Sequence, residues 1–296
     1  MARRRLDGTT AVITGAGSGI GRALALALDA KGCTLALSDV DLPSVQATAD
    51  RCRQATTTRL DVRNASALEA HARHVIADHG TVDLVVNNAG VALTADAVDQ
   101  SLTDIERVLA VNLMGVIHGS QAFLPHLIAS GGHLVNISSL FGLLGVPSQS
   151  AYAAAKFGVR GYTESLAVEM RLHGHPVSVH CVHPGGIRTD IVRRSRTAGR
   201  HRRDEIAAFF DQHLARLDPE EAATAIISGV ERGRSRIHVG TDARVLHLLE
   251  RLLGRHYQRI VSRLASLGPL APGSAAGAPG NLAHRAEHRD PDAAAG

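Results

Sequence analysis

The sequence contains little lysine and few aromatic residues. Only two of its 32 basic residues, Lys31 and Lys156, are lysine. Tryptophan is absent and aromatic residues make up 3% of the chain, so few side chains could stack on nucleic-acid bases. The formal net charge is only +4. Together these features argue against a protein that binds nucleic acid.

Cysteine is also scarce, and no long apolar run is present. Cys33, Cys52 and Cys181 lie far apart without a CxxC pair, which favours reduced structural thiols. No apolar run approaches the roughly 20 residues that span a bilayer. The N-terminus is basic but lacks the apolar stretch of a signal peptide, so we expect a cytoplasmic location. The 17 histidines are not grouped with cysteines or acids at ligand spacing, and we expect no metal site.

Short β-branched runs alternate with helical stretches through the first 240 residues. Several runs are apolar without alternation, as in a parallel sheet that helices cover on both faces. The pattern predicts an α/β fold, a Rossmann-type doubly wound parallel sheet of about seven strands, in one domain over residues 1–241. The candidate strands are 9–14, 33–38, 55–60, 82–87, 132–137, 176–182 and 235–240.

The remaining chain predicts one more helix and a tail. Residues 242–267 place leucines and isoleucine at helical spacing, with arginines on an adjacent stripe at Arg251, Arg255, Arg259 and Arg263. We favour packing of this helix in an oligomer or over an active site; the alternative is contact with an anionic membrane surface. Residues 268–296, rich in Pro, Ala and Gly, are expected to be disordered.

A glycine-rich loop joins the first strand to the first helix. Glycines 15, 17, 19 and 21 fit the spacing T-G-x-x-x-G-x-G and not the general G-x-G-x-x-G pattern. Such a loop places a dinucleotide pyrophosphate at a helix N-terminus. Asp39, at the end of the second strand, could accept both ribose hydroxyls of NAD and would repel a 2′-phosphate. Ser18 and Val40 occupy the positions where an NADP site would want arginine, so NAD is favoured over NADP.

Six motifs then occur in order. They are "TGAGSGIG", "NNAG" at Asn87–Gly90, "VNLMG" with Asn112, "NISS" ending at Ser139, "YAAAK" from Tyr152 to Lys156, and "HPGGIRT" at His183–Thr189. Across residues 7 to about 240 this set resembles the compact, NAD-preferring branch of the short-chain dehydrogenase/reductase (SDR) family. A looser likeness over the later residues is to bacterial secondary-alcohol dehydrogenases.

The spacing of Tyr152 and Lys156 also indicates how the two side chains could act together. Positions i and i+4 of a helix share a face, so the phenol and the ammonium point the same way. A phenol with a pKa near 10 is a poor base at neutral pH. We expect the ammonium and a positively charged nicotinamide to lower that pKa. Ser139 could hydrogen-bond the substrate oxygen.

The resemblance assigns further roles. It implies that Asn112 holds a water connecting Lys156 to solvent, that Asp61 faces the adenine, and that Thr189 holds the nicotinamide amide. Relatives usually carry serine where this chain has Ala155, which makes cofactor affinity less certain. The expected cofactor-binding residues are Gly15, Ser18, Gly19, Ile20, Gly21, Asp39, Asp61, Val62, Asn88, Ala89, Gly90, Tyr152, Lys156, Pro184, Gly185, Ile187 and Thr189.

The stretch between Ser139 and Tyr152 is apolar and suits a lipophilic alcohol or ketone. The expected substrate residues are Ser139, Phe141, Leu144, Gln149 and Tyr152, with Leu93, Ile187, Val192, Phe209 and Phe210 as further wall. After Thr189, six arginines (Arg193, Arg194, Arg196, Arg200, Arg202 and Arg203) suggest a mobile lid, more plausibly a solvated loop than a site for an acidic carrier.

The sequence therefore predicts an NAD(P)-dependent short-chain alcohol dehydrogenase/ketoreductase. Its catalytic residues would be Asn112, Ser139, Tyr152 and Lys156, its partner a small-molecule substrate, and its assembly a homodimer or homotetramer. The alternatives are a β-ketoacyl-thioester reductase of the same fold and a non-catalytic dinucleotide sensor.

Overall fold

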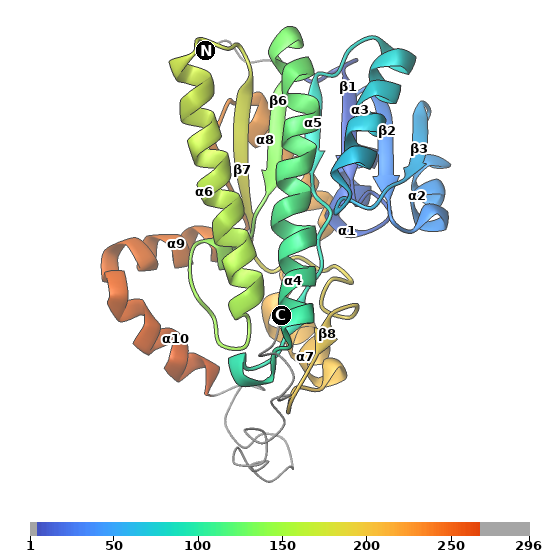
Figure 1. Cartoon of the computed structure of the whole chain (residues 1–296). Coiled ribbons are helices and arrows are strands. Elements are labelled where there is room, and N and C mark those ends of the chain that lie inside the picture. Colours follow the sequence, from blue (N-terminus) through green and yellow to red (C-terminus); the bar gives the residue numbers. More distant parts are fainter. Residues whose placement is uncertain (1–4, 267–296) are drawn as a thin grey trace, which may run out of the picture.

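The computed structural model describes residues 5–266, and a parallel seven-stranded sheet forms its centre (Figure 1). The strand order is β3-β2-β1-β4-β6-β7-β9, which confirms the predicted doubly wound sheet. The strands are β1 (Thr10–Thr14), β2 (Thr34–Asp39), β3 (Ala55–Arg59), β4 (Leu84–Asn87), β6 (His133–Ile137), β7 (Ser178–Pro184) and β9 (Arg236–Val239).

Two layers of helices cover the sheet, because its strands carry apolar side chains on both faces. Successive side chains of a strand point to opposite faces. In β1, Ala11 and Ile13 pack against α1 (Gly19–Asp29), α2 (Leu42–Ala49) and α8 (Pro219–Glu231). Val12 points the other way, toward α3 (Ala65–His79), α5 (Gly115–Ser130) and α6 (Ser150–Leu172).

The strand order reverses at β1, which has β2 on one side and β4 on the other. In open parallel sheets, ligands bind outside the carboxyl ends of the strands at such a switch point. The glycine loop follows β1 and the NNAG turn follows β4, so the fold brings these two motifs to one edge.

A buried polar network ties two strands to the helices behind them. The Asn87 amide donates to Asn136 Oδ1 at 2.9 Å and to Ser120 Oγ at 3.2 Å. The Asn136 amide donates to Thr163 Oγ1 at 3.0 Å. Because buried polar groups without partners are costly, this network specifies how β4, β6, α5 and α6 meet.

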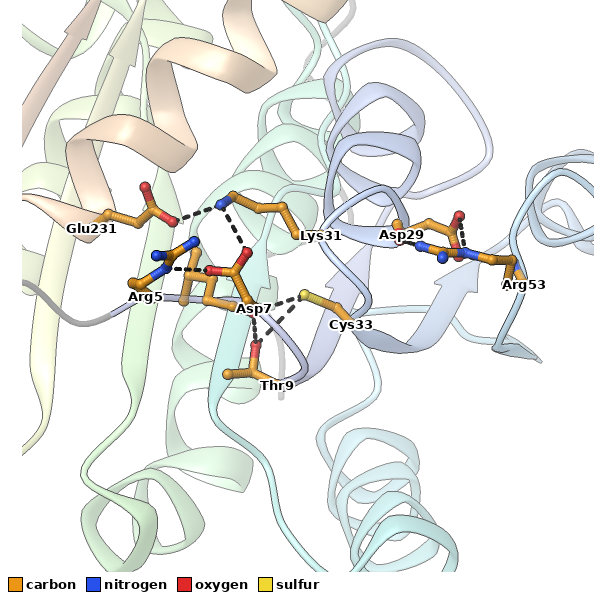
Figure 2. A network of polar contacts seen from close by, with 9 residues as sticks. Arg5, Asp7, Thr9, Asp29, Lys31, Cys33, Arg53 and Glu231 are labelled. Atoms are coloured by element: carbon orange, nitrogen blue, oxygen red, sulfur yellow. Dashed lines mark hydrogen bonds and ion pairs between the residues drawn. The ribbon is translucent and has the colours of Figure 1, made fainter.

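A second polar cluster lies at the opposite end of the molecule from the glycine loop (Figure 2). Lys31 Nζ lies 2.9 Å from Glu231 and 3.6 Å from Asp7, which also pairs with Arg5. Lys31 thus joins the chain start to the ends of α1 and α8. Lys31 sits in an ordinary surface ion pair, whereas the other lysine, Lys156, is buried.

The C-terminal helix is not continuous as predicted for 242–267. The chain forms α9 (Thr241–Leu253), a 3-10 turn at Gly254–His256, and α10 (Tyr257–Ala265). Gly254 has φ of +49°, and this left-handed conformation ends α9. The predicted disordered tail at 268–296 lies outside the described residues.

Two short strands beside the sheet were not predicted. Strand β5 (Leu93–Thr94) pairs with β8 (Arg196–Thr197). The remaining α-helices are α4 (Leu102–Leu109) and α7 (Arg203–Phe209). Two-residue strands carry no recognisable period, so the sequence could not indicate them.

One stretch of the described residues, Leu102–Ser130, is long and apolar enough to cross a membrane by length and composition. Its charged residues, Asp104, Glu106 and Arg107, all lie near its start, and the polar Asn112, His118, Ser120 and Gln121 interrupt the apolar residues that follow. Phe123 and Leu127 of this stretch are fully buried against the sheet. We therefore interpret it as a core helix.

Glycine at position 119 is required by the buried network. A Cβ there would overlap Asn87 Oδ1. We expect Gly119→Ala to lower the free energy of unfolding by about 1–3 kcal/mol through overpacking. Gly161→Ala is the matched control, because nothing lies near a Cβ on that exposed helical position. Urea denaturation of both variants tests this; equal stabilities would contradict it.

Candidate active site

The candidate site is assembled at the carboxyl edge of the sheet. The loops after β1, β4, β6 and β7 meet there, together with the first turns of α6. Each strand ends in one of the motifs noted in the sequence. Parallel pairing therefore brings together side chains that lie more than 100 residues apart.

The glycine loop is clasped by the NNAG turn. The Asn88 amide donates to the carbonyls of Thr14 and Gly15 at 3.0 and 3.1 Å, and the backbone N–H groups of Asn88 and Ala89 donate to Thr14 Oγ1. Gly15 has φ of +66°, and a Cβ there would lie 2.7 Å from the Ala89 Cα. Only glycine fits this close approach.

The loop leaves a helix N-terminus open. Ser18 is the N-cap of α1 but makes no capping side-chain bond, and the first turn of α1 holds no acidic residue. Gly19 has φ of +53°, and a Cβ there would lie 3.1 Å from Thr189 Cγ2. A free helix N-terminus lined by glycine fits a pyrophosphate. Gly21 and Ile20, at the start of α1, complete the cradle, and Ile20 also packs against the core.

Asp39 is held at the mouth of this loop. Its carboxylate accepts from the backbone N–H of Gly17 at 2.9 Å and of Asp41 at 3.1 Å. An open surface pocket of about 390 Å³ lies beside it, lined by Val40, Asp41, Leu42, Pro43 and Arg59. Arg59 is the cross-strand neighbour of Asp39. Sequence reasoning missed this arginine because it comes from the next strand and not from the loop.

Asp61 pairs with Arg63, and the adenine contact that the resemblance implies for it stays a prediction. Both of its oxygens accept from the Arg63 guanidinium at 2.6–3.0 Å. Hydrogen bonding to Arg63 lowers the pKa of Asp61. The neighbouring Val62 is buried and packs against Gly115, where a Cβ would lie 2.6 Å from Val62 Cγ2.

Tyr152 and Lys156 lie on the first turns of α6, next to Ser139. Ser139 Oγ accepts from the Phe141 backbone N–H at 3.1 Å and lies close enough to the Tyr152 hydroxyl to lower the pKa of that phenol. The Tyr152 ring meets Phe141 edge to face, with centroids 6.1 Å apart. Lys156 is 3% exposed, and its Nζ lies 5.7 Å from the Tyr152 ring centre.

The Tyr152 pKa was expected to be lowered by Lys156 together with an oxidised nicotinamide; in the free protein it is raised instead. The tyrosine is only half-buried as a whole, but its hydroxyl is enclosed by protein, and this burial raises its pKa to about 12. Lys156 Nζ donates instead to the Ile137 carbonyl at 2.9 Å. Burial lowers the pKa of Lys156 to about 8, and so weakens the charge that was expected to activate the phenol.

Asn112 is tied to the loop after Gly90. Its Oδ1 accepts from the Val91 N–H and its Nδ2 donates to the Val91 carbonyl, both at 2.8 Å. The residue sits in a π-helical turn at Ala110–Met114. The side-chain amide therefore fixes the loop after Gly90, and the water site that the resemblance implies stays a prediction. A Cβ on Gly90 would lie 3.3 Å from Asn112 Oδ1.

The expected substrate residues separate into two groups. Phe141 and Tyr152 face each other at the site. Leu144 is 4% exposed and packs with Ala243 of α9, and Gln149 donates to Thr94 Oγ1 at 2.9 Å. Ile187 is also buried, in the core beneath α1 and α8. Sequence spacing could not distinguish these packed residues from pocket walls.

Ala155, where relatives carry serine, is fully buried. It packs with Leu93, Val108 and Ala151 in an apolar cluster. Position 155 is therefore a packing position in this protein, and an apolar alanine suits it better than serine. The substitution leaves Tyr152 and Lys156 in place.

The expected mobile lid of arginines is largely ion-paired. Arg193 pairs with Asp211 at 2.6 Å, Arg196 with Asp104 at 2.7 Å and Arg200 with Asp96 at 2.8 Å. Asp96 also accepts from Ser148 just before α6. Charge pairing thus ties this segment to Asp96 and Asp104, although Arg193 and Arg196 remain exposed to solvent.

Two residues beyond residue 240, which the sequence did not indicate, hold the loops of the site. Asp242 accepts from the Gly186 N–H at 2.8 Å and so fixes the loop after Pro184 and Gly185. The Tyr257 hydroxyl accepts from the Gly145 N–H at 3.0 Å. Both contacts span long sequence distances, and no local motif marks them.

Comparisons with known proteins agree with this geometry. The family model for short chain dehydrogenases matches residues 9–199. SadH of Mycobacterium tuberculosis, named as an oxidoreductase, is 51% identical over 261 residues, covering 86% of this chain and 95% of its own. A cyclohexanol dehydrogenase of Acinetobacter is 32% identical over 194 residues, covering 64% and 76%.

A solved structure shares the fold closely. It is a short-chain dehydrogenase/reductase from Burkholderia phymatum in complex with NAD, 29% identical with a TM-score of 0.77, covering 88% of this chain and 96% of that one. Fold and site define an oxidoreductase of the Rossmann type. The chain belongs to the short-chain dehydrogenase family.

The burial of Lys156 predicts a pH dependence of stability. Its pKa is about 8 when folded and 10.5 when unfolded, so between these values the unfolded chain binds more protons. Stability should therefore rise with pH across this window, by about 3 kcal/mol from this group. In Lys156→Met this rise should be missing.

Urea denaturation at pH 7.5 and pH 10 measures the difference. Lys31→Met is the matched control, because Glu231 raises the pKa of that partly exposed lysine and the variant should keep the wild-type rise. Equal pH slopes for wild type and Lys156→Met would contradict the burial of a titrating ammonium.

Proposed function

We propose that the protein is an NAD-dependent secondary-alcohol dehydrogenase that interconverts a lipophilic alcohol and its ketone. The observation that carries the proposal is the enclosed Tyr152 hydroxyl, close to Ser139 and beside an open helix N-terminus. A buried phenol and a hydroxyl next to a dinucleotide cradle can move a proton and orient an alcohol oxygen.

The residues divide the work as follows. The bound dinucleotide would accept the hydride from the alcohol carbon. Tyr152 takes the hydroxyl proton during oxidation and returns it to the ketone oxygen during reduction. Ser139 Oγ accepts from Phe141, which leaves its own proton free to donate toward the substrate oxygen or Tyr152. Lys156 Nζ uses one N–H for Ile137 and keeps two for other acceptors.

Tyr152 needs a further cation in order to act as a base. Burial alone leaves its pKa near 12, too high for proton uptake at neutral pH. A positively charged oxidised nicotinamide beside the phenol would favour the phenolate. In this proposal the base is activated only in the complex with the oxidised cofactor.

Support for NAD comes from Asp39, whose fixed carboxylate would repel a 2′-phosphate. The Burkholderia relative was solved with NAD. Support for a lipophilic secondary alcohol comes from Phe141 against Tyr152 and from the cyclohexanol dehydrogenase. The thioester-reductase alternative loses support because the arginines proposed to meet an acidic carrier are mostly paired. We expect a homodimer or homotetramer.

Removing one oxygen tests the acid/base assignment. We expect Tyr152→Phe to abolish turnover, to less than about a thousandth of the wild-type rate, because no other group can take the proton. NADH binding should persist. The assay is NADH formation over a panel of secondary alcohols graded by chain length and ring size. Retention of a tenth of the wild-type rate would refute the assignment.

Cofactor choice is tested at Asp39. We expect Asp39→Arg to shift the ratio of kcat/KM for NAD and NADP toward NADP by about a hundredfold or more, since it replaces a repulsive charge with an attractive one. Arg59→Ala is the control and should keep the preference for NAD. A wild-type enzyme that already prefers NADP would overturn the role given to Asp39.

A further inference from the structure

The outer face of α9 and α10 is apolar and exposed. Leu248 and Leu249 lie three and four residues after Val245, and Leu252 lies four and three residues after them, so all four share one face of α9 and are 40–73% exposed. Ile260 and Leu264 continue the stripe on α10. Of the fifteen large hydrophobic side chains exposed in residues 5–266, six lie on these two short helices. Such a cluster marks a surface that contacts something else.

Arginines flank this stripe, and all are exposed. They are Arg244, Arg251, Arg255, Arg259 and Arg263. Within residues 5–266 no carboxylate lies at ion-pair distance from any of them. Of the two acids on these helices, Asp242 accepts from the Gly186 N–H, and Glu250 lies 4.0 Å from His247, whose pKa is lowered by burial. The charge of this face therefore needs an anionic partner.

The inner face of the same helices packs against the rest of the protein. Ala243, Leu246 and Tyr257 pack on the segment of Leu140, Leu143 and Leu144 that follows Ser139. The apolar outer stripe is thus not a misplaced core face. Figure 1 shows the bent α9–α10 pair, in orange to red, at one side of the molecule, outside the layers that cover the sheet.

We propose that the α9–α10 face, defined by Val245, Leu248, Leu249, Leu252, Ile260, Leu264 and the five arginines, docks on an anionic lipid surface. A helix with an apolar stripe and adjacent arginines lies in the membrane interface, with its apolar side chains among the acyl chains and its guanidinium groups at the phosphates. The inner face would then hold the loop after Ser139 directly above the lipid.

A second copy of this chain fits the face less well. In a two-fold interface the same patch meets itself, so five arginines would face five arginines with only Glu250 of each copy to offset them. Juxtaposed like charges disfavour such a contact. An anionic lipid surface satisfies both the apolar stripe and the charge. The inference rests on this face alone and is independent of the proposed activity.

Vesicle flotation of the full chain tests the proposal. The probes are vesicles of pure phosphatidylcholine and of phosphatidylcholine mixed equally with phosphatidylglycerol, at low and high salt. We expect the protein to float only with the anionic vesicles and to be released by salt. Absence of flotation with anionic vesicles at low salt would overturn the proposal.

Matched variants locate the binding face. Arg251→Glu/Arg255→Glu/Arg259→Glu should weaken vesicle binding by more than about tenfold. Its control, Arg51→Glu/Arg73→Glu/Arg171→Glu, reverses as many exposed arginines elsewhere and should bind like wild type. If the α9–α10 triple variant still binds vesicles, another segment binds the lipid. If both triple variants lose binding equally, the overall charge of the protein causes it. Either result would overturn the proposal.

The apolar stripe is tested in the same way. Leu248→Gln/Leu252→Gln should reduce flotation, whereas Leu102→Gln/Leu172→Gln, at equally exposed sites on α4 and α6, should not. Circular dichroism checks that each variant folds. Sedimentation velocity without lipid tests whether a second copy of the chain covers this face instead. If Leu248→Gln/Leu252→Gln dissociates a wild-type oligomer, a second copy covers the face and the proposal fails.

Discussion

A reciprocal pair of hydrogen bonds between β6 and α6 organises the candidate site. Lys156 Nζ donates to the Ile137 carbonyl at 2.9 Å, and Ser138 Oγ donates to the Lys156 carbonyl at 2.9 Å. Both bonds are buried, where they are stronger and where a lost partner is costly. They fix the end of β6 against the first turns of α6. Ser139 and Tyr152, one on each side of this clasp, are thereby held within hydrogen-bonding reach.

The rest of the site depends on similar long-range contacts. Asn88 clasps the glycine loop, Asn112 fixes the loop after Gly90, and Asp242 holds the loop after Gly185. In each case a side chain from one element satisfies backbone groups of a loop that would otherwise be free. The site is thus preorganised by the scaffold while the N-terminus of α1 stays open for a ligand.

Sequence reasoning predicted the fold well because buried parallel strands and glycine loops leave local patterns. The seven strands of the sheet and the helical pairing of Tyr152 with Lys156 followed from such patterns. The partners of Asp61, Asn112 and Gln149 did not, because a side chain's partner depends on three-dimensional packing. In the free protein the pKa of Tyr152 is raised because burial, which the sequence does not reveal, outweighs a cation turned toward Ile137. Its lowering beside an oxidised nicotinamide stays a prediction.

The central claim is that Tyr152 becomes a base only beside an oxidised nicotinamide. The chain has three tyrosines, so ¹³C NMR of chains labelled at tyrosine Cζ, with Tyr152→Phe for assignment, can follow this phenol directly. The account predicts a pKa near 12 for the free protein and a markedly lower value with NAD, but little change with NADH, whose ring is neutral. A pKa that stays unchanged on NAD binding would contradict it.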